Sequence, residues 1–201
     1  MLYFAHRINS INELKFIPKE IGVEIDIRDQ GADLVLSHDP FHKDLPPIND
    51  YLKLVEGRPL IANIKSERIE NRFYKMLQKF SPHSDYFFLD SSLNVMALNK
   101  GKFNFASRFS EFESLETSIK MIKKSLVNWL WIDTFTQLPI NKKNISILNN
   151  LKIKKCLTSP DLLGRDYEIM QYAESIRKMN FKLDAICCKY KNIKIWEKFL
   201  S

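Results

Sequence analysis

Short apolar runs, rich in β-branched and aromatic residues, recur along the chain with helix-like stretches between them. The clearest helical patterns cover Arg68–Phe80, Arg165–Met179 and Ile193–Leu200. Strands that alternate with helical patterns are typical of βαβ units and a parallel sheet. Eight runs are expected to form strands: Leu2–Ala5, Gly22–Ile27, Pro59–Lys65, Tyr86–Leu89, Phe103–Ser107, Trp129–Ile132, Lys155–Thr158 and Ala185–Cys188. The pattern therefore predicts an α/β fold, a compact (β/α)8 TIM barrel.

The length of the chain limits how this barrel is built. Eight strand–helix units in 201 residues leave little room for insertions, so several helices are expected to span only one or two turns. No stretch rich in Pro, Gly or Ser marks a linker, which predicts a single domain over residues 1–201.

With only five glycines and no G-x-G-x-x-G or G-x-x-x-x-G-K-[ST] motif, the chain does not resemble a Rossmann or P-loop nucleotide-binding protein.

Composition narrows the choice of partners. The formal net charge is +7, but the lysines are scattered and no block of five like charges occurs, so no nucleic-acid partner is expected. Three cysteines, two of them adjacent, cannot form a disulfide framework, and we expect them to be buried thiols. No signal-peptide pattern and no apolar run long enough for a membrane span is found. These features predict a cytoplasmic protein and leave its oligomeric state open.

Two carboxylates interrupt the second predicted strand. Glu24 and Asp26 are two residues apart and therefore point to the same face, whereas Val23, Ile25 and Ile27 occupy the other face and would pack against helices. Two like charges directed into a barrel are costly unless something neutralises them. Carboxylate oxygens are the ligands that Mg²⁺ and Ca²⁺ prefer. The pair thus indicates a site for a divalent cation.

Further charged and polar residues follow the neighbouring strands. His6–Arg7 ends the first run, His38–Asp39 follows the short segment Asp33–Ser37, and Asn63 and Lys65 form another same-face pair at the end of the third run. Active sites of (β/α)8 barrels lie at the carboxyl ends of the strands. We therefore expect these residues to gather at one rim with the two carboxylates.

Taken in chain order, these segments resemble the motifs of the glycerophosphodiester phosphodiesterase family, a (β/α)8 barrel of the phospholipase-C-like phosphodiesterase superfamily. The motifs are Ala5-His6-Arg7, Gly22-Val-Glu24-Ile-Asp26, Leu36-Ser-His38-Asp39-Pro40 and Ile64-Lys65. They cover about the first third of the chain, and the remainder agrees only in its barrel-like rhythm.

The resemblance implies a metal-dependent phosphodiesterase that hydrolyses a small glycerol- or sugar-linked phosphodiester. Each residue that matches a family motif takes a role by this resemblance: acid/base catalysis by His6 and His38, phosphate binding by Arg7 and Lys65, and binding of Mg²⁺ or Ca²⁺ by Glu24, Asp26 and Asn63.

The sequence departs from the family pattern at three points. Asn63 stands where the family has a glutamate ligand, so metal affinity should be lower. Ile8 replaces the usual glycine after His-Arg. Only 25 residues separate His38 from Asn63, so the small subdomain often inserted there is expected to be absent or vestigial. Three carboxylates could compensate for the missing ligand: Glu67, Asp90 and Asp133.

Two alternatives to a hydrolase stay open at this point. One is a barrel that has lost turnover and binds a phosphorylated ligand or a protein partner, and the other is a lyase that leaves a cyclic phosphate. Polar residues after the later strands could contact the alcohol: Arg108, Glu111, Asp133, Ser159, Asp161 and Lys189. Trp129 and Trp131 share a strand face and are expected to pack in the protein interior.

Overall fold

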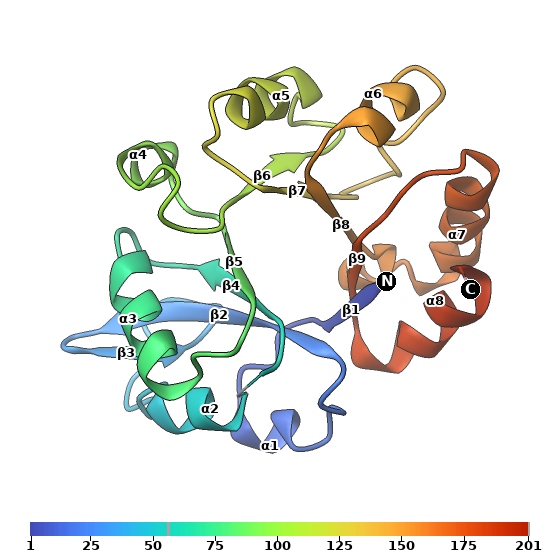
Figure 1. The fold of residues 1–201 in the computed structure, drawn as a ribbon. Coiled ribbons are helices and arrows are strands. Elements are labelled where there is room, and N and C mark those ends of the chain that lie inside the picture. Colours follow the sequence, from blue (N-terminus) through green and yellow to red (C-terminus); the bar gives the residue numbers. More distant parts are fainter. Residues whose placement is uncertain (56, 201) are drawn as a thin grey trace. The chain divides into compact units, whose positions relative to one another are not determined.

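The computed structural model describes residues 1–55 and 57–200 and divides the chain into two compact units (Figure 1). The N-terminal unit comprises Phe4–Phe105, and the C-terminal unit comprises Met1–Tyr3 with Ala106–Ser201. In both units parallel strands alternate along the chain with helices. The alternation predicted from the sequence is confirmed in each unit. The assignment of residues 1–201 to a single domain stays a prediction.

The N-terminal unit contains a parallel sheet in the order β5-β4-β2-β1, with the short strand β3 antiparallel to β2. Its strands are β1 (Leu2–Ala5, of which Phe4 and Ala5 lie in this unit), β2 (Gly22–Gln30), β3 (Asp33–Leu36), β4 (Leu60–Ile64) and β5 (Tyr86–Leu89). Its helices are α1 (Ile11–Leu14), α2 (Asn49–Leu54), α3 (Glu70–Phe80) and α4 (Leu93–Leu98).

Local sequence explains several of these boundaries. Helix α1 is capped by Ser10, whose hydroxyl accepts a hydrogen bond from the Glu13 amide and donates one to the Glu13 carboxylate. Gly31 takes the left-handed conformation, with φ of 59°, at the turn between β2 and β3. At Gly22 a β-carbon would lie 2.5 Å from the ring of Phe4, so only glycine allows β1 and β2 to approach this closely.

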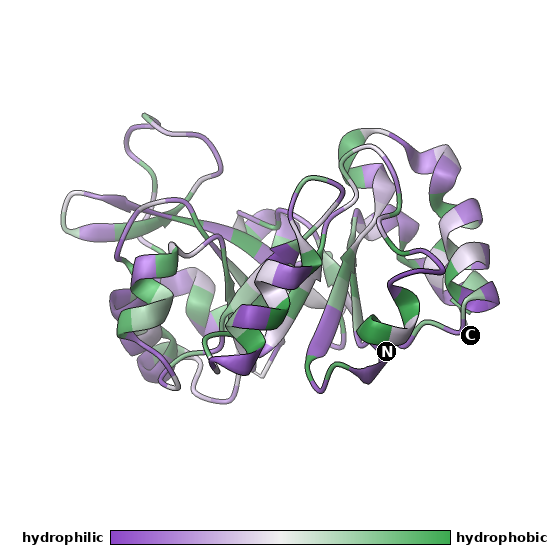
Figure 2. Ribbon diagram, turned by 90° about the horizontal axis from the view of Figure 1, so that it is seen from above, coloured by the Kyte–Doolittle hydropathy of each residue, from purple (hydrophilic) through white to green (hydrophobic). Residues whose placement is uncertain are grey.

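The core of the N-terminal unit lies between the sheet and its helices. All five residues of β4 are buried, as expected for a strand covered on both faces. On α3, Phe73 and Leu77 are one helical turn apart and both fully buried. Truncating either to alanine would cost about 2–5 kcal/mol. In Figure 2 the apolar colouring is concentrated along the strands, and polar colouring covers much of the helices.

The C-terminal unit repeats the arrangement with the sheet order β9-β8-β7-β6. Its strands are β6 (Ala106–Phe109), β7 (Trp129–Ile132), β8 (Lys154–Thr158) and β9 (Ala185–Cys188). Its helices are α5 (Leu115–Lys123), α6 (Ile145–Asn150), α7 (Ile169–Lys178) and α8 (Ile193–Leu200). Short 3-10 turns occupy Pro160–Leu163, Asp166–Glu168 and Tyr190–Asn192.

Two expectations about side chains are confirmed in the C-terminal unit. Cys156, Cys187 and Cys188 are buried free thiols. Trp129 and Trp131 are both buried within the unit. Among the residues that the structure describes, no helix is long and apolar enough to cross a membrane.

Two predicted boundaries were wrong. The fifth run was expected to form a strand from Phe103, but β6 starts at Ala106. Before it, Phe105 makes only an isolated parallel bridge to Phe88, and the Phe103 ring packs against the Phe88 ring. The helix expected from Arg165 starts at Ile169 and is preceded by a 3-10 turn. In that turn the Arg165 side chain donates to backbone carbonyls of residues 134–136, which holds it outside the regular helix.

Candidate active site

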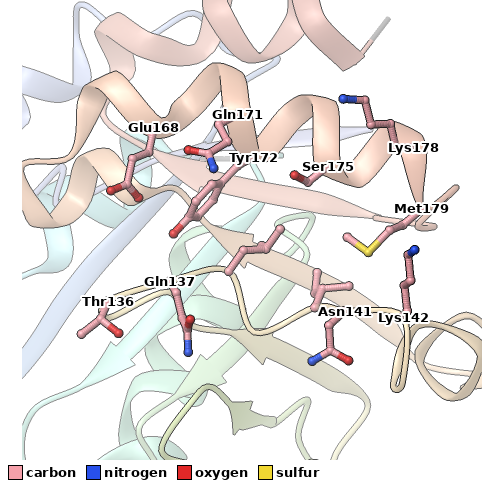
Figure 3. Close-up of a pocket in the computed structure, with 12 residues that line it drawn as sticks. Thr136, Gln137, Asn141, Lys142, Glu168, Gln171, Tyr172, Ser175, Lys178 and Met179 are labelled. Atoms are coloured by element: carbon pink, nitrogen blue, oxygen red, sulfur yellow. The ribbon is translucent and has the colours of Figure 1, made fainter.

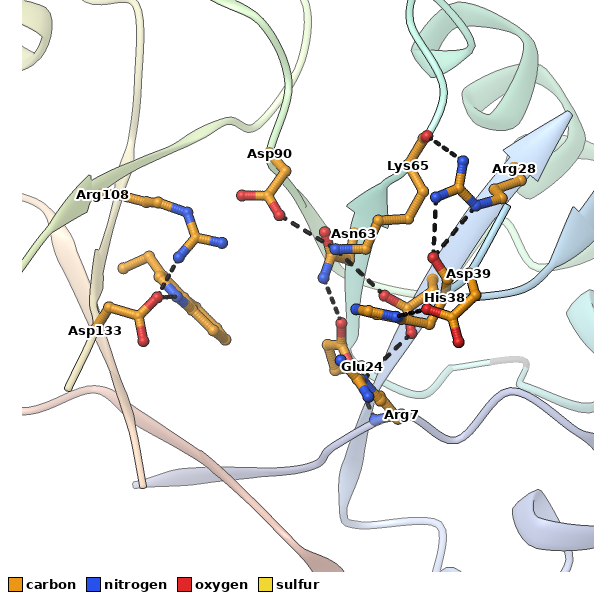
Figure 4. A network of polar contacts seen from close by, with 12 residues as sticks. Arg7, Glu24, Arg28, His38, Asp39, Asn63, Lys65, Asp90, Arg108 and Asp133 are labelled. Atoms are coloured by element: carbon orange, nitrogen blue, oxygen red, sulfur yellow. Dashed lines mark hydrogen bonds and ion pairs between the residues drawn. The ribbon is translucent and has the colours of Figure 1, made fainter. Parts of the chain in front are cut away.

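Strand β2 forms the centre of the candidate site, and all seven residues to which the sequence assigns a role lie in the N-terminal unit (Figure 4). Glu24, Asp26 and Arg28 occupy alternate positions of β2 and so share one face. The two carboxylates are almost completely buried, with 1% and 0% exposure. Arg28 was missed in the sequence, although the same two-residue spacing could have identified it.

Main-chain hydrogen bonds attach three other segments to β2. The Ile8 amide donates to the Glu24 carbonyl (2.9 Å), the Ser37 amide to the Asp26 carbonyl (3.0 Å), and the Lys65 amide to the Ile27 carbonyl (2.9 Å). The segment after β1, the segment after β3 and the end of β4 therefore all meet β2 near its two carboxylates. This arrangement brings the predicted histidines, arginine, amide and lysine to one region of the unit.

The Glu24 carboxylate is held by two hydrogen bonds. Asn63 Nδ2 donates to Oε1 and the Arg7 amide donates to Oε2, both at 2.8 Å, while His6 Nε2 lies 3.8 Å from Oε2. Arg7 has φ of 53°, a left-handed conformation that is unusual for a residue with a side chain. Burial raises the pKa of Glu24 to about 7, and the negative charge of Asp26 adds to this rise. The hydrogen bonds from Asn63 and the Arg7 amide favour the ionised carboxylate and lower the pKa, but their effect is smaller.

The Asp26 carboxylate has a different set of neighbours. Asn9 Nδ2 donates to Oδ2, and the Asp26 amide donates back to Asn9 Oδ1, both at 2.9 Å. Two cations also approach it, Lys65 Nζ at 3.6 Å from Oδ1 and Arg7 Nε at 3.9 Å from Oδ2. No sequence signal pointed to Asn9, because its role depends on how the segment after β1 meets β2.

Lys65 also pairs with a carboxylate from the next strand. Its amino group lies 3.3 Å from Asp90 Oδ2, directly after β5. Asp90 was one of three carboxylates considered as a substitute for the missing glutamate. Of the other two, Glu67 accepts a hydrogen bond from the Ser92 hydroxyl, and Asp133 belongs to the C-terminal unit.

His38 is oriented by the residue that follows it. His38 Nδ1 lies 2.7 Å from Asp39 Oδ1, and this hydrogen bond lowers the pKa of Asp39. Because the ionised carboxylate can only accept, Nδ1 carries the proton. The other ring nitrogen, Nε2, therefore carries the lone pair that can accept a proton.

Arg28 connects the two segments that flank β2. Its guanidinium donates to the His38 carbonyl through Nη2 (2.9 Å) and Nε (3.3 Å), and to the Lys65 carbonyl through Nη1 (2.7 Å). The backbone at His38 and the backbone at Lys65 are therefore tied to one side chain, as Figure 4 shows.

The residues expected to bind a cation fit such an ion in their chemistry. Asp26 and Asn63 are direct partners in the pairing of β2 with β4. Asp26 Oδ1 and Asn63 Oδ1 are both buried and accept no hydrogen bond. With Glu24 they form a set of oxygen donors, which suits Mg²⁺ or Ca²⁺. Among the described residues no cluster of three or more His, Cys, Asp or Glu side chains is arranged to hold a metal ion, so the amide oxygen of Asn63 would have to supply the third ligand.

The comparisons with known proteins bear on the fold. The sequence matches no protein-family profile and no curated protein. A solved glycerophosphodiester phosphodiesterase from Thermotoga maritima matches with a TM-score of 0.72 and 15% identity, over 97% of each chain. The chain has the fold of that protein. A phosphodiesterase from Oleispira antarctica, solved with its product sn-glycerol-3-phosphate, matches equally well, with a TM-score of 0.72 and 14% identity over 98% of this chain and 97% of that one. The predicted (β/α)8 barrel is confirmed.

The polar residues expected after the later strands make contacts within the C-terminal unit. Arg108 donates to Asp133, which also accepts from Trp131 Nε1 at 3.1 Å (Figure 4). Asp161 is fully buried and accepts from the Lys189 amide at 3.1 Å. The remaining two have similar partners: Glu111 accepts from Thr136 and Gln137, and Ser159 from Trp196. Whether any of these residues contacts the alcohol stays a prediction.

Each unit also has a cavity. In the C-terminal unit, a hollow of about 580 Å³ lies between residues 136–142 and α7, and it contains none of the residues to which the sequence assigned a role (Figure 3). In the N-terminal unit, a cavity of about 490 Å³ lies beside α1 and α2. Its lining includes Asn9, the partner of Asp26, and Leu36, two residues before His38.

Proposed function

We propose that the protein is a phosphodiesterase that hydrolyses a small glycerol- or sugar-linked phosphodiester with a bound divalent cation. The observation that carries the proposal is that His6, Arg7 and Lys65 all lie within 4 Å of the buried carboxylates of β2, while His38 follows Ser37, whose amide is bonded to Asp26. This set combines proton-transfer groups, cations and hard oxygen ligands in one unit, which is what the hydrolysis of an anionic diester requires. The fold shared with solved phosphodiesterases supports the same reaction class.

The two cationic side chains are suited to the phosphate. A phosphodiester carries one negative charge, and further charge develops on its oxygens as the nucleophile attacks. Arg7 and Lys65 both approach the Asp26 carboxylate, at 3.9 and 3.6 Å, so two positive charges lie beside a residue that would hold the cation. The Arg7 side chain is half exposed, which leaves it accessible to a ligand.

The two histidines are suited to proton transfer. With Nδ1 bound to Asp39, His38 presents Nε2 to the substrate, and His6 Nε2 lies near Glu24 Oε2. One histidine takes a proton from the nucleophile and the other protonates the departing alkoxide. Each transfer is worth about 10²–10⁴ in rate.

Glu24, Asp26 and Asn63 would hold the cation. When bound, a divalent ion polarises the phosphoryl oxygens and neutralises part of their charge. The chain itself prepares the site by burying two carboxylates together, with Asn9 orienting the Asp26 carboxylate and the Arg7 amide orienting that of Glu24. An amide at Asn63 contributes no charge, so the affinity for the ion is expected to be modest.

The test is turnover of a panel of glycerophosphodiesters and sugar phosphodiesters with Mg²⁺, with Ca²⁺ or with EDTA, followed by phosphorus NMR. Release of a linear phosphomonoester that EDTA abolishes supports the proposal. A cyclic phosphate product would assign a lyase instead. Absence of turnover across the panel, with calorimetry showing that phosphomonoesters bind, would favour the barrel that has lost catalysis, an alternative that the amide at Asn63 keeps open.

A further inference from the structure

We propose that Arg28 is a positioning residue that sets the placement of His38 and Lys65 together, and so couples the acid/base group to the phosphate-binding group. The inference rests on the proposed function. It starts from the three hydrogen bonds that the guanidinium donates to the carbonyl oxygens of these two residues.

The location of Arg28 makes this connection possible. On one edge of β2, Arg28 is the partner of Val35 in β3, three residues before His38. On the other edge, β2 pairs with β4, and the Ile27 carbonyl accepts a hydrogen bond from the Lys65 amide. His38 lies in an irregular segment after β3, and Lys65 is the first residue beyond β4. The last main-chain hydrogen bonds to β2 come from the amides of Ser37 and Lys65, and Arg28 adds bonds to the carbonyls of His38 and Lys65.

The guanidinium is engaged with main-chain oxygens. Nε, Nη1 and Nη2 each donate to a carbonyl of His38 or Lys65. Three of its five N–H groups are thereby bound to the main chain, whereas the Arg7 side chain is half exposed. Arg28 is for this reason a positioning residue rather than a phosphate ligand.

Lysine could not replace this function. A planar guanidinium donates in fixed directions to two acceptors at once, whereas an ammonium is a compact charge on a flexible stem. The loss of Arg28 would remove the shared donor from both carbonyls and let the two segments move independently. Because a misplacement of about 1 Å can cost about 100-fold in rate, the expected effect on activity is large.

The experiment compares the wild type with Arg28→Ala, Arg28→Lys and the matched control Arg72→Ala. Arg72 also donates to a backbone carbonyl of the N-terminal unit, that of Ala32, but contacts none of the proposed site residues. Three quantities are measured: kcat and KM for the diester that the wild type hydrolyses fastest, affinity for sn-glycerol-3-phosphate by calorimetry, and amide hydrogen exchange by mass spectrometry.

For Arg28→Ala we expect kcat/KM to fall about 100-fold, with kcat lowered through His38 and phosphomonoester affinity lowered through Lys65. Exchange should become faster in the peptides that contain these two residues and stay unchanged in α3. Arg28→Lys should not restore activity, whereas added guanidinium should partly rescue Arg28→Ala. Arg72→Ala should behave as the wild type.

Two outcomes would overturn the inference: activity and exchange in Arg28→Ala that match Arg72→Ala, or full activity in Arg28→Lys. A wild type that hydrolyses no diester would count against the proposed function instead. The positioning role of Arg28 would then be tested by comparing amide hydrogen exchange and affinity for sn-glycerol-3-phosphate between Arg28→Ala and the wild type. Unchanged values for both in Arg28→Ala would reject it.

Discussion

The burial of Glu24 beside Asp26 predicts that the metal-free protein loses stability as the pH rises. The ordinary pKa of a glutamate, 4.5, applies to the unfolded chain, and in the folded protein burial and the charge of Asp26 raise it to about 7. The folded state therefore holds this proton more tightly than the unfolded state. The resulting stability is fully present below pH 4.5 and is lost as the pH rises through about 7.

The magnitude follows from the size of this rise. Each pKa unit corresponds to about 1.4 kcal/mol, so a rise from 4.5 to about 7 amounts to about 3 kcal/mol at pH 8. The substitution Glu24→Gln removes the charge but retains the shape. The glutamine can accept from the Arg7 amide, and once the Asn63 amide flips, so that Oδ1 replaces Nδ2 at this contact, it can also donate to Asn63 Oδ1. We expect this variant to be inactive and more stable than the wild type at pH 8.

The assay is urea unfolding in EDTA between pH 4.5 and 8. The difference in free energy of unfolding between Glu24→Gln and the wild type should grow by about 3 kcal/mol over this range. Glu20→Gln, at an exposed glutamate, is the control and should show no such growth. Adding Mg²⁺ or Ca²⁺ should stabilise the wild type and not Glu24→Gln. A difference that stays constant with pH would refute the reasoning.

Three further predictions concern other residues. Asn63→Glu should tighten the binding of Mg²⁺ or Ca²⁺ in a calorimetric titration, and an unchanged affinity would show that residue 63 is not a ligand. Tyr51→Phe should lower the free energy of unfolding by about 1–3 kcal/mol, because it leaves the buried Ile8 carbonyl without its donor, and a smaller loss in urea unfolding would argue against that bond. Burial lowers the pKa of Lys155, so the folded state binds this proton less tightly than the unfolded chain. The stability of the wild type relative to Lys155→Met should therefore rise as the pH approaches 10.5, and unfolding at pH 8 and 10 checks the sign.

The alternation of strands and helices was readable from the sequence because buried parallel strands appear as short, continuous apolar runs. The start of β6 was not, because Phe103 and Phe105 are as apolar as strand residues, yet Phe103 only packs against Phe88 and Phe105 makes a single isolated bridge to it. The helical pattern from Arg165 was likewise interrupted by contacts of its side chain with distant carbonyls. In both cases a tertiary contact overrode the local pattern.

The candidate site divides in the same way. The two-residue spacing on β2 pointed to Glu24 and Asp26, and extending it by one step would have included Arg28. Asn9 and Asp90 depend on which loops meet β2 and β4, which no local pattern encodes. The hydrogen bond from Asn63 to Glu24 likewise depends on the pairing of β2 with β4 and could not be predicted from a local pattern. The roles of the seven residues stay predictions until activity is measured.

The most direct test of the account is the turnover of a glycerophosphodiester by the wild type, His6→Ala and His38→Ala, with the surface substitution His83→Ala as control. Phosphorus NMR follows the product, and circular dichroism confirms folding. We predict that the wild type and His83→Ala release a phosphomonoester, and that each of the other two variants is folded but at least about 100-fold slower. Wild-type rates in His6→Ala or His38→Ala would contradict the acid/base assignment on which the proposed function depends.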